Sequence, residues 1–196
     1  MPASVAGFEE TMMTNATRTH QADLLWILLF TIASTLTTLI FACATPFPAL
    51  AALAAVHLDR RDGVLLMLAA WAVSQAIGFC ALGYPWDAAT ALTGVAIGTA
   101  AVAGTIVASV VDTYVPARST LARLAIAYVA AFATFKLGIL FWAPVIGHAD
   151  VALSLPILER QFVRYAVILA VFYALYRLLT AMGVPAPDAA PRTVLA

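Results

Sequence analysis

Six apolar runs, one of them short, occupy most of this sequence and are separated by prolines and charged residues. A segment that crosses a bilayer must satisfy its own backbone hydrogen bonds, and an α-helix needs about 20 apolar residues for this. Of the 196 residues, 64% are hydrophobic and 10% are charged. Soluble domains are on average roughly 45–50% hydrophobic and about 25% charged. The pattern predicts an all-α membrane protein and excludes an ordinary soluble fold.

The apolar runs predict six transmembrane helices in a single membrane domain. They lie at residues 22–44, 47–58, 63–83, 88–111, 120–143 and 158–182. The second is too short to cross about 30 Å of hydrocarbon at about 1.5 Å per residue, so it must be tilted, broken or covered by its neighbours. We expect the domain to span residues 22–183, between a cytoplasmic N-terminal segment (1–21) and a disordered, proline-containing tail (184–196).

Basic residues predict the orientation, because cytoplasmic loops carry an excess of Arg and Lys. On one predicted side lie Arg60, Arg61, Arg118, Arg123, Arg177 and Arg192. The opposite loops, at 44–48, 84–87 and 144–157, contain neither Arg nor Lys. Arg160 and Arg164 oppose this trend. The majority predicts a multi-pass protein of the cytoplasmic (inner) membrane with both termini cytoplasmic.

Several function classes are excluded by what the sequence lacks. Ten basic and ten acidic residues give zero net charge, so nothing offers the basic surface that nucleic acid requires. The single lysine, Lys136, is not part of a GxxxxGK[ST] phosphate loop, and GxSxG and HExxH motifs are absent. Lys136 lies inside the fifth run, where a charge either marks a functional position or extends toward the membrane surface.

Small and aromatic residues give two further expectations. Small residues line the fourth run at Gly94, Ala96, Gly98, Ala100, Gly104 and Ala108. Such a stripe lets helices approach closely, which favours packing within the bundle over docking of a partner subunit. Trp26, Trp86 and Trp142 are interpreted as an aromatic belt at the membrane boundary.

Cys80 is the main candidate for chemistry, since it lies near the outer end of the third run beside Gly83-Tyr84-Pro85-Trp86. Its thiol could be inert packing, half of a disulfide with Cys43, or a soft metal ligand. The histidines, His20, His57 and His148, form no cluster around it. One thiol cannot hold a free ion, but a metal in an organic macrocycle needs only one axial ligand. The metal alternative therefore narrows to a tetrapyrrole-type ligand.

Three segments together resemble the BtuM family: Thr45-Pro46-Phe47-Pro48-Ala49-Leu50, Asp59-Arg60-Arg61-Asp62, and residues 75–86, QAIGFCALGYPW. These small membrane proteins are similar to the S components of energy-coupling factor (ECF) transporters and are specific for vitamin B12 (cobalamin). The similarity covers about residues 45–98. It implies a six-helix bundle of the S-component type that takes up cobalamin from the outer side. It also implies base-off cobalamin with Cys80 as axial cobalt ligand, which favours a free thiol over the disulfide.

Cobalamin is thus the expected substrate, and Cys80 the expected cobalt ligand. A corrin suits an apolar cavity with a few polar anchors, and the expected contacts are Thr45, Phe47, Tyr84, Trp86 and Tyr165. Thiolate donation at Cys80 could also assist decyanation of cyanocobalamin, with a reductant from elsewhere. The first run holds Ala33 and Thr37 instead of the Ala-xxx-Ala pair that docks S components. Use of a shared ECF module and solitary action are therefore alternatives.

Two other classes of protein compete with a B12 uptake protein. One is a membrane-embedded redox protein that holds haem or quinone, although haem normally requires a histidine inside the bundle. The other is an accessory subunit that docks a partner through the small residues of the fourth run. The accessory subunit would retain no small-molecule ligand.

Overall fold

The computed structural model describes residues 21–35, 46–114, 119–146 and 154–187. These ranges contain helices and connecting turns and no β-strand. The helices are Gln21–Thr35, α2 (Phe47–His57), α3 (Arg60–Cys80), α4 (Ala88–Tyr114), α5 (Thr120–Ile146) and α7 (Leu155–Ala181). Each overlaps one of the six predicted runs. The prediction of an all-α membrane protein is confirmed.

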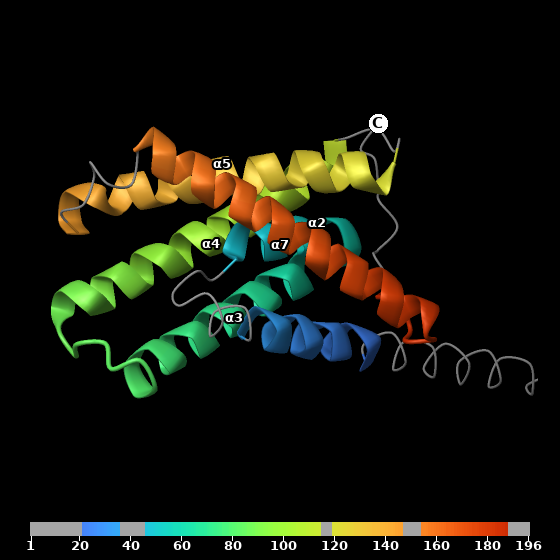
Figure 1. The fold of residues 1–196 in the computed structure, drawn as a ribbon, viewed down its shortest axis with the longest axis horizontal. Helices are drawn as coiled ribbons and strands as arrows, with labels where there is room; N and C mark the ends of the chain where they lie inside the picture. The colour runs from blue at the N-terminus through green and yellow to red at the C-terminus, as the bar shows by residue number, and fades with distance from the viewer. Residues whose placement is uncertain (1–20, 36–45, 115–118, 147–153, 188–196) are drawn as a thin grey trace, which may run out of the picture.

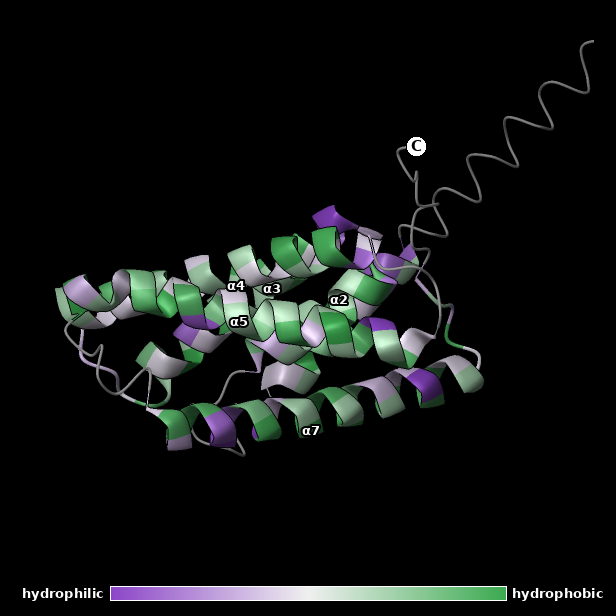
Figure 2. Cartoon of the chain, turned by 90° about the horizontal axis from the view of Figure 1, so that it is seen from above, coloured by the Kyte–Doolittle hydropathy of each residue, from purple (hydrophilic) through white to green (hydrophobic). Residues whose placement is uncertain are grey.

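Four of these helices, α3, α4, α5 and α7, are long and apolar enough to cross a membrane. Hydrophobic residues recur along the length of these helices (Figure 2). Leu137 on α5 and Val171 on α7, for example, are 64% and 59% exposed. Apolar surface of this extent requires a lipid environment. The helix Gln21–Thr35 and α2 are shorter, so length and composition support four of the six predicted crossings.

The α2 helix is enclosed by its neighbours. All 11 of its residues are buried, and it packs against α3, α4, α5 and α7. Pro48 lies in the first turn, where the missing N–H costs no helical hydrogen bond. A helix that is apolar on every side is stable only when it is surrounded. Of the three alternatives for the second run, tilted, broken or covered by its neighbours, the structure shows the last.

Small residues bring α4 close to the helices on either side. A Cβ at Gly98 would lie 2.7 Å from the indole of Trp71 on α3, whose Nε1 donates to Gly94 O over 2.8 Å. On the other side, a Cβ at Gly104 would lie 3.1 Å from the carbonyl oxygen of Ala131 on α5. The stripe along α4 therefore packs inside the bundle, as the sequence predicts.

The chain reverses direction between consecutive long helices, so their ends form two groups (Figure 1). The C-terminal ends of α3 and α5 and the N-terminal ends of α4 and α7 lie at one end, here called the loop end. The opposite end is called the arginine end. It carries the N-terminal turns of α3 and α5 and the C-terminal turns of α7, with Arg60, Arg61, Arg123 and Arg177.

The helix Gln21–Thr35 is attached to the bundle through Trp26. The indole is fully buried, lies 4.9 Å from the ring of Tyr176 on α7, and donates from Nε1 to Pro185 O over 2.7 Å. The interpretation of Trp26 as a belt residue is therefore wrong, because its N–H is satisfied by protein. Pro185 belongs to the non-helical residues 184–187. The rest of the predicted disordered tail, 188–196, and residues 1–20 lie outside the described residues.

Replacing Gly138 with Ala should destabilise the bundle. The new Cβ would lie 2.7 Å from Ala100 Cβ and 3.0 Å from Ala100 Cα, so α4 and α5 must separate. We expect a loss of about 1–3 kcal/mol, although Ala is by itself the better helix former. Denaturant unfolding in detergent, followed by tryptophan fluorescence, measures this. Leu137→Ala on the exposed side should change little; equal losses in both variants would contradict close packing at Gly138.

Candidate functional site

The end of α3 is shaped by a glycine turn that positions the candidate residues. Gly83 has a φ of 70°, a left-handed conformation that favours glycine. The turn lets Leu82 N donate to Ile77 O over 3.0 Å and Tyr84 N donate to Gly78 O over 3.0 Å. These bonds satisfy carbonyl groups at the helix end. Tyr84 is thereby folded back against the last turn of α3.

Gly78 creates the space for the Tyr84 ring. A Cβ at position 78 would lie 2.6 Å from two ring carbons of Tyr84. The ring also meets Phe79 edge-on, with centroids 6.2 Å apart. The spacing Gly-Phe-Cys-x-x-Gly-Tyr thus places an aromatic ring against the helix end that carries Cys80.

Cys80 is an exposed free thiol beside a small aromatic cluster. It is the last residue of α3, and the neighbouring Phe79 ring packs on Trp86 with centroids 4.6 Å apart. Trp86 is 82% exposed. The geometry therefore groups two of the predicted residues, Tyr84 and Trp86, around the ring of Phe79, which directly precedes Cys80 in α3. Sequence reasoning missed Phe79, although it is adjacent to the candidate cysteine.

The start of α4 anchors the other side of this loop. Asp87 Oδ1 accepts a hydrogen bond from Thr90 N over 2.7 Å, which is a helix N-cap. The hydrogen bonds from Thr90 lower the pKa of the Asp87 carboxyl below its usual value. The carboxylate also matches the positive end of the helix dipole. Cap and glycine turn together fix the loop between α3 and α4.

The remaining predicted contacts have other surroundings. Phe47 and Tyr165 are 3% and 7% exposed. Their rings lie 6.2 Å from Phe135 and 6.3 Å from Phe132, both on α5. They belong to the bundle interior. Thr45 and Cys43 lie outside the described residues, as do His20 and His148, so the predicted Thr45 contact stays a prediction.

Lys136 is paired across two helices. Its Nζ donates to Gln161 Oε1 on α7 and lies 5.7 Å from the centroid of the Phe132 ring. The side chain is half-buried. The amide oxygen and the ring face give the ammonium group a polar contact and a cation–π contact within the helix pair. The sequence left two interpretations of Lys136, a functional position or a side chain that extends toward the membrane surface. In the structure, Lys136 has a partner inside the protein.

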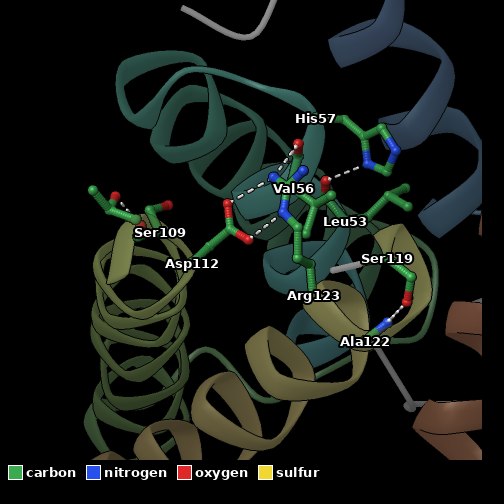
Figure 3. Close-up of polar contacts among 9 residues, drawn as sticks. Leu53, Val56, His57, Ser109, Asp112, Ser119, Ala122 and Arg123 are labelled. Carbon is green, nitrogen blue, oxygen red and sulfur yellow. Dashed lines mark hydrogen bonds and ion pairs between the residues drawn. The ribbon is translucent and has the colours of Figure 1, made fainter. Parts of the chain in front are cut away.

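A second polar site, missed in the sequence, lies at the arginine end (Figure 3). Arg123 donates from Nε and Nη2 to the two carboxylate oxygens of Asp112 over 2.8 and 2.9 Å. The Nη2 group also donates to Val56 O, at the end of α2, over 3.2 Å. The side chains of Arg123 and Asp112 are 17% and 3% exposed. The available signal was a charged residue, Arg123, inside the fifth apolar run, with an acidic residue directly after the fourth.

His57 ends α2 beside this ion pair (Figure 3). Its Nδ1 donates to Leu53 O over 3.1 Å, because a carbonyl oxygen can only accept. The ring packs on Tyr176 of α7, with centroids 4.2 Å apart. His57 is 9% exposed, so it is a histidine inside the bundle. Among the described residues, no group of three or more His, Cys, Asp or Glu could hold a metal ion.

Apolar helices around a buried α2, with polar groups at both ends, define an α-helical protein embedded in a membrane. No family model, curated protein or solved structure matches this chain.

Removing the Asp112 carboxylate should cost more than removing the whole ion pair. Asp112→Ala leaves Arg123 without its counter-charge, and we expect a loss of about 3 kcal/mol, since breaking a mostly buried pair typically costs this much. Adding Arg123→Met removes the stranded charge and should restore part of the stability. Denaturant unfolding of both single variants and the double variant measures the coupling. Strictly additive losses would show that the pair does not stabilise the bundle.

Proposed function

We propose that this protein binds cobalamin at the loop end of the bundle and mediates its uptake across the bacterial cytoplasmic membrane. Cys80 is the axial cobalt ligand. The observation that carries the proposal is the free, exposed thiol of the last residue of α3, which directly follows Phe79, whose ring contacts those of Tyr84 and Trp86. The resemblance of residues 45–98 to the BtuM family supports the choice of ligand.

A cysteine at this position suits a corrin for chemical reasons. The corrin occupies the equatorial positions of cobalt, so a single soft thiolate from the protein is sufficient. The exposed Trp86 ring and its partner Phe79 offer flat apolar surface for the corrin. We place the dimethylbenzimidazole base of cobalamin away from cobalt, because Cys80 takes its axial position.

The charge distribution supports capture from the outer side. Arg60, Arg61, Arg123 and Arg177 lie at the arginine end, which by the positive-inside rule faces the cytoplasm. The loop end then faces outward. With both termini at the cytoplasmic side, cobalamin would reach Cys80 without crossing the bilayer. Whether the chain acts alone or on a shared ECF module is part of the proposal to be tested.

Cys80 could also assist removal of cyanide from cyanocobalamin. An external reductant donates one electron to cobalt(III), giving cobalt(II), and cyanide leaves from the axial position opposite the thiolate. The protein contributes the thiolate ligand and the base-off geometry. Cyanide release from cyanocobalamin by purified protein with added reductant, compared with Cys80→Ser, tests this step separately from binding.

The visible absorption spectrum of detergent-purified protein, after incubation with cobalamin and washing, tests the binding site. We expect retained corrin with a spectrum shifted toward thiolate-bound, base-off cobalt. Cys80→Ser should lose this spectrum, whereas Cys43→Ser should keep it, because the proposal assigns cobalt to Cys80 alone. Trp86→Ala should weaken retention several-fold without destabilising the bundle, since its side chain is exposed.

The outcomes separate the alternatives. Retained but unshifted corrin in all variants would keep cobalamin and remove the cysteine ligand. Loss of the spectrum in Cys43→Ser as well would contradict the assignment to Cys80. No retained corrin in the wild-type protein would favour an accessory subunit. Alanine at Phe47 or Tyr165 tests the cavity less cleanly, because truncating a buried aromatic costs about 3–5 kcal/mol of stability.

A further inference from the structure

A cavity of about 400 Å³ lies at the arginine end, between α2, α5 and α7. Its polar lining consists of His57, Thr120, Arg123, Tyr173, Tyr176, Arg177 and Thr180. We call it the arginine-end cavity. It is separate from the Cys80 cluster, which lies at the opposite end of the long helices. Nothing in the cobalamin proposal uses it.

The lining offers hydrogen-bond donors from α5 and α7. Arg177 donates from Nη1 to the Tyr173 hydroxyl over 3.2 Å, which leaves that hydroxyl proton free to point into the cavity. The Tyr176 hydroxyl makes no hydrogen bond within the described part of the chain. Thr120 is the first residue of α5, so the positive end of that helix dipole also lies here.

Of the two arginines that line the cavity, only Arg177 has a charge that no described carboxylate neutralises. Arg123 is neutralised by the two oxygens of Asp112, and none of the described residues that line the cavity carries a carboxylate. Arg177 is exposed and forms no ion pair among the described residues. Two backbone carbonyl groups of lining residues already accept side-chain hydrogen bonds: Val56 O accepts from Arg123, and Tyr176 O accepts from Thr180. The cavity therefore carries a net charge of about one and an excess of donors, as expected for an anion site.

We propose that the arginine-end cavity binds a phosphate group that carries a single negative charge, as a phosphodiester does. Guanidinium and hydroxyl donors from several directions match the several oxygens of phosphate. The site is at the C-terminal end of α7, a helix long and apolar enough to cross a membrane, so a group bound there would lie at the boundary of the lipid. The headgroup of an anionic phospholipid meets both conditions, because basic pockets between transmembrane helices bind such headgroups.

Lipid titration of the purified full-length protein in detergent, read by native mass spectrometry, tests the site. The probes are phosphatidylglycerol and diacylglycerol, which share acyl chains but differ in phosphate. We expect phosphatidylglycerol to bind more tightly than diacylglycerol to the wild-type protein. Arg177→Gln should weaken phosphatidylglycerol about ten-fold, as loss of a charge-assisted hydrogen bond typically does.

Two further variants keep the test independent of folding. Arg160→Gln removes an exposed arginine from the other end of α7 and should leave phosphatidylglycerol binding unchanged. Tyr176→Phe removes only a hydroxyl that has no partner in the described residues, so it should weaken binding a few-fold at unchanged thermal stability. Equal binding by wild type, Arg177→Gln and Tyr176→Phe would overturn the proposal. So would equal binding of the two lipids.

Inorganic phosphate and glycerol phosphate distinguish the source of the phosphate group. If the group belongs to a lipid, millimolar concentrations of either ion should not displace phosphatidylglycerol. Displacement that depends on Arg177 would support the phosphate site but overturn its assignment to a lipid headgroup. Because the readout is phosphate binding at the arginine end, failure here leaves the cobalt spectrum at Cys80 unaffected.

Discussion

A helix buried on all sides must have its terminal carbonyl groups satisfied inside the protein, and α2 is such a helix. The end of α2 meets Arg123, which donates to Val56 O, and His57 bonds back to Leu53 O. A guanidinium in this largely enclosed place requires a counter-charge. Asp112 supplies it from α4. One buried helix end thus accounts for a charged pair between two apolar helices.

The close approach of α4 and α5 depends on residues without bulky side chains. Gly104 and Gly138 allow backbone and Cβ contacts that a larger residue would prevent. In a membrane the helices gain little from hydrophobic burial, because the lipid is as apolar as the side chains, so packing contacts provide much of the association energy. The small residues of α4 therefore position α5, and with it Arg123, against the end of α2.

The two ends of the bundle offer different chemistry. At the loop end, a soft thiol stands beside exposed aromatic rings, which suits a large ligand with flat apolar faces. At the arginine end, hydroxyl groups and the Arg177 guanidinium line a cavity, which suits a phosphate oxygen. The long apolar helices separate these groups. The proposed substrate and the proposed lipid would therefore bind without competing for the same side chains.

The sequence by itself determined the helices. Their positions follow from apolar runs interrupted by proline and charge, because the bilayer requires each crossing to satisfy its own backbone. It also placed Cys80, Tyr84 and Trp86 in one short turn, since local spacing suffices to bring them together. For the short second run the sequence left three alternatives, tilted, broken or covered, because its length excludes only an ordinary crossing; the tertiary structure shows it covered.

Only the tertiary structure decided the contacts between distant segments. The buried position of Trp26, the pairing of Asp112 with Arg123 and the cavity beside His57 each join helices that are far apart in the chain. Periodicity and residue type assign a side chain to a helix face, but they do not say which helix that face meets. Phe47 and Tyr165 illustrate this limit. Their aromatic character fits a ligand cavity and an aromatic core equally well, and the packing of α5 places them in the core because apolar rings are most stable where other rings enclose them.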